Sequence, residues 1–401
     1  MNQNTAAKSN PSFTLLLMLN TFIYISVALY SPFLSAYYAQ QGLSSSQIGI
    51  LRTISSISCV FIQPLWARRS DKTGKAKHYA SLVVLGVMLS LYTFYIGNSF
   101  WNFLFSSFLL TIFSTSVSPL IDAIVVRNAD RLHYNFALIR MGGTVGYAII
   151  SLVVGIYLKK NPSYQFLFAS ISYAFLLFLI FRLPNSENHQ PIAEPKPYNF
   201  KHLFQLADIF VSKNIYFVLA FAFIYQLGAS FLGSFMGVYV VSLGYSQAQV
   251  GMLSCVQAVS EVPVLLLLPK LNKKFNGLHL IAIASALMGI RLLVASGGSL
   301  TFLILAQAMQ GITYMVIHFG AITYISSHVK SGKSSQGQSV LYIVQTGIAS
   351  IIGQVIGGFT IDTIGIQLSY ITVGIFVVIT TVIIMAVLFR FEQKQNIVKV
   401  Q

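Results

Sequence analysis

Long apolar segments recur along the whole of this 401-residue chain, and they restrict its fold more than any other feature of the sequence. An apolar run of about 18 residues or more can cross the hydrocarbon of a bilayer as a helix. We count twelve such segments, which begin near residues 13, 46, 79, 101, 135, 164, 214, 247, 278, 301, 338 and 366. Only 8% of the residues are charged, against about 25% in a soluble domain. The sequence therefore predicts an all-α membrane protein with twelve transmembrane helices.

The net charge of +16 is distributed unevenly between the connections of these segments. Alternate connections and the C-terminal tail are basic, whereas the others carry little charge apart from Lys159 and Lys160. Basic residues collect on the cytoplasmic side of membrane proteins, so we expect a multi-pass protein of the cell membrane with both termini in the cytoplasm. A nucleic-acid partner would need these charges on one continuous surface, which their spread along the chain does not favour.

An internal repeat divides the chain into two halves. Residues 42–53 read GLSSSQIGILRT and residues 244–255 read GYSQAQVGMLSC, at an offset of 202 residues. An offset of half the chain is typical of transporters built from two parallel repeats. We predict a six-helix bundle over residues 1–183, a proline-rich cytoplasmic linker over residues 184–212 and a second six-helix bundle over residues 213–401.

We place five charged residues inside the apolar segments: the acids Asp122 and Glu261, and the arginines Arg52, Arg140 and Arg291. A charge at the centre of a bilayer costs about 3 kcal/mol or more, so it is normally kept for the handling of a substrate, an ion or a proton. Arg52 lies near the end of its segment, where its side chain can either reach the surface or line an outer vestibule.

Asp122 and Arg140 lie at equal distances from the connection between the fourth and fifth segments. In an antiparallel helix pair they would lie at the same depth, either as a structural ion pair or as an acceptor and a donor for a polar solute. Tyr147 follows Arg140 by two helical turns and can offer a ring and a hydroxyl to a sugar or a nucleoside. Gly142, Gly143 and Gly146 lie between them, where packing between helices is the expected role.

Glu261 and Arg291 are both expected near the middle of the bilayer in the second half. The pKa of a buried glutamate depends on its surroundings, so we predict Glu261 as a proton carrier with Arg291 as its charge partner. A static salt bridge is the alternative. His318 could relay protons or simply pack in the interior, and Gln310 could donate a hydrogen bond to the substrate.

The segment PLIDAIVV, followed within LIRMGGTVGYAI by an arginine eighteen residues after the acid, resembles the fourth and fifth helices of the lactose permease-like proton symporters. These proteins belong to the major facilitator superfamily, and their group includes oligosaccharide, nucleoside and phenylpropionate permeases. The resemblance implies that Asp122 and Arg140 bind a sugar and that Tyr147 takes the place of a stacking tryptophan.

The segment PLWARRSDKTGKAK resembles the loop between the second and third helices of the same superfamily. This resemblance implies that Asp71, Lys72, Gly74 and Lys75 form a gating loop, for which a solvated turn is the alternative. Arg291 resembles an arginine that assists proton release. The histidine and glutamate that couple protons in the tenth helix of the lactose permeases have no counterpart at residues 310–314.

We therefore expect a proton-coupled symporter that imports a small polar solute, with a sugar or glycoside as the first substrate class and a nucleoside or aromatic acid as the second. An exporter is disfavoured because the fifth segment lacks proline, and a membrane sensor because no segment is long enough for a signalling domain. Neither enzymatic activity, nor a cofactor, nor a metal site is expected, because the sequence lacks the motifs for them. The proton, the solute and the lipid bilayer are its expected partners, and we expect a functional monomer.

Overall fold

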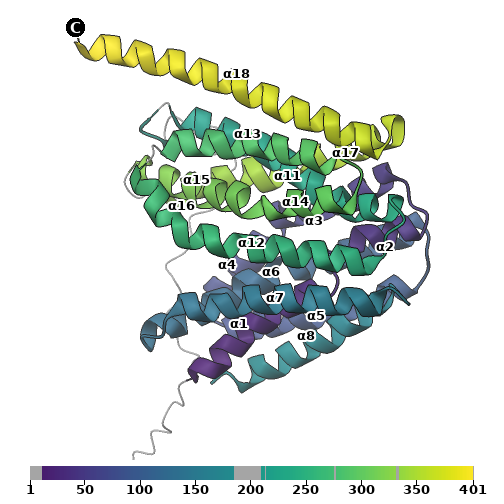
Figure 1. Ribbon diagram of the computed structural model, residues 1–401. Coiled ribbons are helices and arrows are strands. Elements are labelled where there is room, and N and C mark those ends of the chain that lie inside the picture. Colours follow the sequence, from purple (N-terminus) through teal and green to yellow (C-terminus); the bar gives the residue numbers. More distant parts are fainter. Residues whose placement is uncertain (1–10, 185–208, 213, 275–276, 331–333, 401) are drawn as a thin grey trace, which may run out of the picture. The chain divides into compact units, whose positions relative to one another are not determined.

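The computed structural model describes residues 11–184, 209–212, 214–274, 277–330 and 334–400, and nearly all of them are helical (Figure 1). In the described part, β structure is limited to one isolated bridge between Phe210 and Val329. Most of the predicted linker, residues 185–208, lies outside the described residues. The observed helices begin close to the twelve predicted starts, since the apolar runs themselves set their limits.

The chain forms two compact units. The first unit comprises residues 1–34 and 61–198, and the second comprises residues 35–60 and 199–401. Residues 35–60, which the sequence assigns to the N-terminal bundle, contact helices of the second unit. The predicted bundle boundaries stay a prediction.

The helices of the first unit are α1 (Phe13–Ala28), α4 (Gln63–Thr73), α5 (Ala76–Tyr92), η1 (Thr93–Tyr95), α6 (Phe100–Arg131), α7 (Phe136–Leu158) and α8 (Tyr164–Arg182). Within this unit α1 packs against α6, α7 and α8, and α5 packs against α6 and α8. Ser12 caps α1 and Ser99 caps α6, each by accepting a hydrogen bond from a backbone N–H of the first turn. Helix α1 thus faces both helices that carry Asp122 and Arg140.

The second unit begins with α2 (Leu34–Gln40) and α3 (Ser45–Phe61) and continues with the following helices: α11 (Ile215–Ser242), α12 (Gln247–Lys274), α13 (Gly277–Ala295), α14 (Leu300–Ala308), η2 (Gly311–Met315), α15 (Val316–Ser327), α16 (Ser334–Tyr342), η3 (Ile343–Ala349), α17 (Ser350–Ile364) and α18 (Ile366–Val400). Helix α11 packs against α13, α17 and α18. The η2 and η3 segments are π-helical, and each interrupts a longer helical run. Such π segments are frequent at functional sites.

The two copies of the sequence repeat have the same local structure. Gly42 and Gly244 both adopt positive φ, at 82° and 80°, which glycine tolerates without steric penalty. The next helix starts three residues later in each copy. The backbone N–H of Ser44 donates to Gln47 Oε1 at 3.0 Å, and that of Ser246 donates to Gln249 Oε1 at 3.0 Å. The repeat therefore encodes a left-handed glycine followed by a serine whose backbone is bound by a glutamine side chain of the next helix. In the first copy Gln47 N–H also donates to Ser44 Oγ, which completes a capping box.

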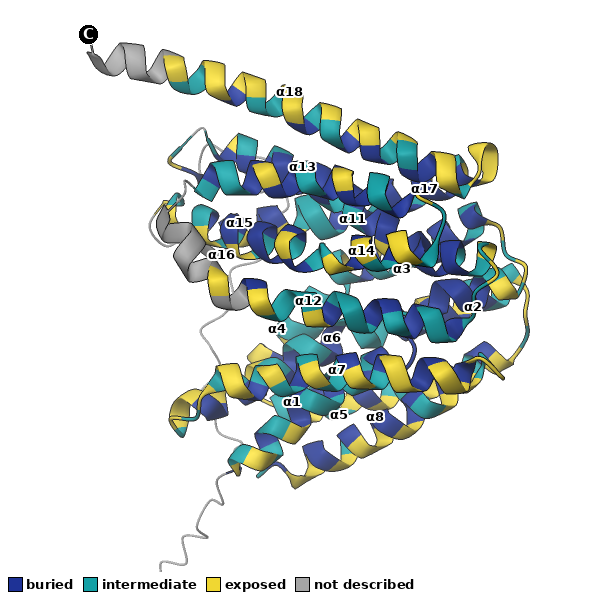
Figure 2. Ribbon diagram, viewed as in Figure 1, coloured by how far each residue is buried: buried dark blue, intermediate teal, exposed yellow. Residues whose placement is uncertain are grey.

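The apolar side chains of this protein lie both in its interior and on its surface (Figure 2). Small polar side chains such as Ser26, Ser90 and Ser285 are fully buried among the apolar core, while many large apolar side chains are exposed. Helix α7 exposes an apolar stripe at helical spacing: Leu138, Met141, Val145, Ile149, Leu152 and Ile156. Ten helices of the described part are long and apolar enough to cross a membrane, and the shorter apolar helix Phe13–Ala28 precedes them. This is the surface of a protein that is surrounded by lipid.

Candidate functional site

The carboxylate of Asp122 is held by an amide that the sequence analysis did not consider. Asp122 lies half-buried on α6, and its Oδ1 accepts a hydrogen bond of 2.8 Å from Nδ2 of Asn20 on α1. Asn20 is fully buried. It is the only residue with a side-chain amide in α1, and this amide within an apolar segment was the sequence signal that could have identified it.

The guanidinium of Arg140 lies on an aromatic ring. Its Cζ is 4.0 Å from the ring centroid of Tyr24, which is one helical turn after Asn20 on α1. Arg140 is close enough to Asp122 for their charges to interact. Within the described residues, however, the two side chains form no direct ion pair, since Asp122 contacts Asn20 and Arg140 contacts Tyr24. The two predicted residues therefore lie near each other in the structure, but their side chains bind different partners.

The three glycines after Arg140 let α7 approach α1. A Cβ on Gly142 would lie 2.6 Å from Thr21 Oγ1, and one on Gly143 would lie 3.0 Å from Asn20 Oδ1. A Cβ on Gly146 would lie 3.0 Å from Thr21 Cγ2. All three therefore serve packing between α1 and α7. Tyr147 follows them and is half-buried, on the same helix as Arg140.

In the second unit, Arg291 of α13 is 2% exposed, and each of its three side-chain nitrogens donates a hydrogen bond. Its Nε donates to the carbonyl oxygen of Ala306 at 2.7 Å, and its terminal nitrogens donate to Gln307 Oε1, Gln310 Oε1 and, at 3.4 Å, Thr313 Oγ1. A buried guanidinium needs such partners, because it has lost its water. Gln307 and Thr313 were not predicted, although with Gln310 they form a polar line at three-residue spacing in the sequence.

Gln310 lies between the two charged groups that were predicted to pair. Its Oε1 accepts from Arg291, while its Nε2 donates to Glu261 Oε1 at 3.4 Å. Glu261 is half-buried on α12. Close contact between α12 and the π segment η2 supports this arrangement, since the backbone N–H of Gly311 donates to Ser260 Oγ at 3.1 Å. Gln310 therefore links Glu261 to Arg291 through its side-chain amide, and the three residues form one cluster.

Two aromatic residues accompany this cluster. Tyr225 of α11 is 2% exposed and close enough to Arg291 and Glu261 to interact with their charges. His318 of α15 is half-buried, and its ring stacks on Tyr314 with centroids 5.2 Å apart. It also meets Phe319 edge to face at 5.3 Å. The contacts of His318 are those of a packed ring; its predicted part in proton transfer stays a prediction.

The predicted gating loop forms the end of a helix. Asp71 and Lys72 lie exposed in the last turn of α4, Gly74 caps that helix with φ 68°, and Lys75 precedes α5. Glycine is favoured at this left-handed capping position. Arg52, from the preceding helix α3, is half-buried.

A third acidic residue in the apolar helices escaped the sequence analysis. Asp362 lies in α17, two residues before the helix ends at Ile364. Its two carboxylate oxygens accept the backbone N–H groups of Ser45 and Ser46, each at 2.8 Å. It thus caps the first turn of α3, where a negative charge is favoured.

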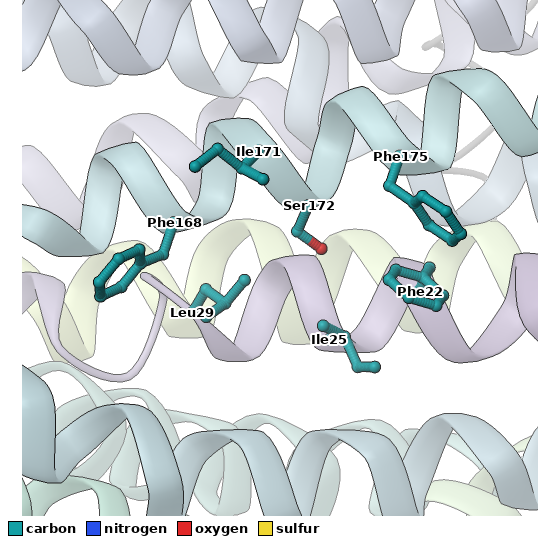
Figure 3. Close-up of a pocket in the computed structure, with 7 residues that line it drawn as sticks. All are labelled: Phe22, Ile25, Leu29, Phe168, Ile171, Ser172 and Phe175. Atoms are coloured by element: carbon teal, nitrogen blue, oxygen red, sulfur yellow. The ribbon is translucent and has the colours of Figure 1, made fainter.

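An apolar cavity of about 380 Å³ lies between α1 and α8 (Figure 3). Figure 3 shows Phe22, Ile25 and Leu29 on one wall and Phe168, Ile171, Ser172 and Phe175 on the other. The hydroxyl of Ser172 lies 2.8 Å from that of Ser26 and is paired with it. The lining therefore suits a hydrocarbon chain and not a polar solute. Among the described residues, no three His, Cys, Asp or Glu side chains gather as a metal site.

The family model of the MFS_1 like family matches residues 14–372, nearly the whole chain. The chain belongs to this family. It is a multi-pass membrane transporter of the major facilitator type, as the resemblance of its fourth and fifth helices implied. The maltose permease of Geobacillus stearothermophilus is 24% identical over 67% of each chain. The lactose permease of Klebsiella oxytoca is 22% identical over 88% of this chain and 89% of its own.

Solved structures agree with the twelve-helix major facilitator fold. A mutant of the nucleoside transporter NupG matches with a TM-score of 0.82 at 16% identity, over 93% of this chain and 98% of its own. At this identity the likeness establishes the fold of the transporter and leaves its solute open.

Proposed function

We propose that this transporter is a proton-coupled symporter that imports a small polar organic solute, with sugars and glycosides as the first class. The observation that carries this proposal is the arrangement of Asp122 and Arg140, which are near each other but not joined. Because neither charge is saturated by the other, an acceptor and a donor stay available to a hydroxylated solute. The permeases for maltose and lactose among its relatives support the same class.

Glu261 is proposed as the proton carrier. It is half-buried, and it accepts a hydrogen bond of 3.4 Å from Gln310, which is itself bound to Arg291. The ionised carboxylate of Glu261 can only accept hydrogen bonds, as it does from Gln310 Nε2, whereas the protonated carboxyl group can also donate one. The two forms therefore favour different hydrogen-bond arrangements of Glu261, Gln310 and Arg291. Coupling through Glu261 would replace the histidine and glutamate that the lactose permeases carry on their tenth helix.

In this proposal residues 1–183 and 213–401 rock about the solute by alternating access, while the linker joins them on the cytoplasmic side. Both termini are cytoplasmic, the protein lies in the cell membrane and the monomer is the working unit. The segment Asp71, Lys72, Gly74 and Lys75 acts as the gating loop between the second and third membrane spans.

The experiment is a solute screen in a weakly buffered suspension of cells that produce the protein. Glycosides, nucleosides and aromatic acids are added in turn, and the external pH is followed. Symport of a sugar predicts alkalinisation after addition of a glycoside, which cells with an empty vector do not show. Alkalinisation by nucleosides or aromatic acids alone would make the second substrate class the correct one, and acidification would indicate export by antiport. Uptake without any pH change would contradict proton coupling.

A further inference from the structure

Two buried polar atoms near Asp122 have no hydrogen-bond partner in the described part of the chain. They are Oδ1 of Asn20 and Nη1 of Arg140. The first is an acceptor on a fully buried side chain, and the second is a charged donor. Most buried polar atoms in proteins are hydrogen-bonded, and each exception calls for an explanation. Asn20 lies on α1, and Arg140 contacts Tyr24, one turn further along the same helix.

The orientation of the Asn20 amide follows from the chemistry of Asp122. A carboxylate can only accept hydrogen bonds, so the amide must turn Nδ2 toward Asp122. This is the bond of 2.8 Å that the structure contains. The amide oxygen then points away from Asp122, and it cannot be satisfied by rotating the amide without losing that bond. Asn20 therefore donates to Asp122 through Nδ2, and its Oδ1 remains as an acceptor.

Tyr24 has the corresponding role for Arg140. The guanidinium lies over the ring, where cation–π attraction favours it. Without this ring the long arginine side chain could turn to Asp122 and form a closed bidentate pair. In such a pair the carboxylate oxygens of Asp122 and the N–H donors of Arg140 would bind each other and would not be available to a solute.

We propose that Asn20 and Tyr24 belong to the solute site: Asn20 binds the solute through Oδ1 and determines specificity, and Tyr24 is a positioning residue that keeps Arg140 open. This inference rests on the proposed function of Asp122 and Arg140, and it narrows the solute. A ligand must bring a donor to Asn20 and an acceptor to Arg140 within the reach of one small molecule. Neighbouring hydroxyl groups, as in polyhydroxylated solutes, provide both.

The role of Asn20 is tested with p-nitrophenyl α-glucoside and α-galactoside and with their mono-deoxy analogues, on the purified transporter. For the wild type, one deoxy position should weaken binding by about 10-fold or more, because Oδ1 is then left unpaired. In Asn20→Ala the same analogue should bind as well as its parent glycoside. A merely structural role would weaken parent and analogue equally, and an unchanged ratio would overturn the assignment.

The role of Tyr24 is tested with a matched pair of variants. Tyr24→Phe keeps the ring beneath Arg140 and should retain more affinity for either glycoside than Tyr24→Leu does. Tyr24→Leu removes the ring and should weaken binding by about 10-fold. Equal affinities of the Leu and Phe variants would contradict a positioning role.

A third measurement needs no solute and so separates this inference from the proposed function. Phenylglyoxal modifies accessible guanidinium groups, and mass spectrometry of peptides gives the rate at Arg140 alone. Tyr24→Leu should slow the modification because Arg140 then pairs with Asp122, and adding Asp122→Asn should restore the rate. An unchanged or faster rate in Tyr24→Leu overturns the inference. If the wild type binds neither glycoside, the proposed substrate class is wrong. The rate of phenylglyoxal modification at Arg140 then still tests whether Tyr24 keeps Arg140 apart from Asp122.

Discussion

Arg140 and Arg291 occupy apolar helices in chemically different ways. Arg291 is 2% exposed, and its donors are bound by Ala306, Gln307, Gln310 and Thr313. Arg140 is half-buried, rests on a ring and keeps a buried nitrogen without a hydrogen bond. An arginine whose three nitrogens all donate hydrogen bonds within the protein stabilises the packing around it. An arginine with a nitrogen that has no protein partner is suited to binding a ligand. The two residues should therefore respond differently to substitution.

Arg291→Leu should lower stability strongly. The change leaves the buried Gln307 and the half-buried Gln310 without their donor, and each buried acceptor that loses its hydrogen bond costs about 1–3 kcal/mol. The apparent melting temperature of the purified protein in detergent measures the effect. Arg291→Lys keeps the charge but not the planar fork, so it should fall between the wild type and Arg291→Leu. A melting temperature of Arg291→Leu equal to that of the wild type would show that the network contributes nothing to folding.

Arg140→Lys should leave the melting temperature unchanged and reduce solute affinity by roughly 10-fold or more, because an ammonium cannot reproduce the fork of a guanidinium. Binding of the solute found in the screen measures this change on the same preparation. Normal affinity in this variant would place the solute pocket elsewhere.

At the level of single residues, the sequence predicted the charged groups but not their partners. Asp122 and Arg140 were predictable because charge inside an apolar helix is rare and their distances from one connection are equal. Asn20 and Tyr24 come from a helix about a hundred residues earlier, and only the folded packing brings them to these charges. Gln310 was predicted as a solute ligand, which stays a prediction, and it lies between Glu261 and Arg291, a bridge that no spacing rule specifies.

At the level of helices, the sequence predicted where elements begin, but not their internal irregularities. Predicted starts at 247 and 366 coincide with those of α12 and α18. Starts are predictable because turn glycines, caps and the first apolar residue are local signals. The π segments Gly311–Met315 and Ile343–Ala349 were not predicted, because a widened turn depends on contacts with other helices, such as that between Gly311 and Ser260.

Gly143→Ala should weaken solute binding more than Gly146→Ala does. The new Cβ at position 143 would lie 3.0 Å from Asn20 Oδ1 and would also press on the ring of Tyr24. At position 146 it would meet only the aliphatic ends of Thr21 and Ile25, which can shift. Solute affinity of the two variants measures the difference, with their melting temperatures as a control for packing. Equal affinities would mean that Asn20 and Tyr24 take no part in solute binding.

Asp362→Ala should weaken the attachment of α3 to α17. The variant loses both hydrogen bonds to the first turn of α3, an effect of about 1 kcal/mol for a helix cap. We expect a small fall in melting temperature and faster labelling of a cysteine placed at Ser46 by a soluble maleimide. Thr363→Ala, next to Asp362 on the exposed surface of α17, serves as the matched control. Equal labelling rates in the two variants would contradict the cap.

For the whole molecule, the repeat at offset 202 is realised as the same glycine turn and the same serine–glutamine hydrogen bond in both copies. The sequence therefore carries the duplication in a form that the structure reproduces. It does not reveal that residues 35–60 pack with the second unit. Packing between distant segments depends on contacts such as that between Asp362 and Ser45, which are encoded far apart in the chain.

The central claim is that solute entry is coupled to a proton through Glu261. The most direct test compares wild type and Glu261→Gln in liposomes, using the solute identified by the screen. With an imposed proton gradient the wild type should accumulate solute, whereas Glu261→Gln should not; both should exchange external for pre-loaded solute, since exchange needs no net proton movement. Full accumulation by Glu261→Gln would contradict the account.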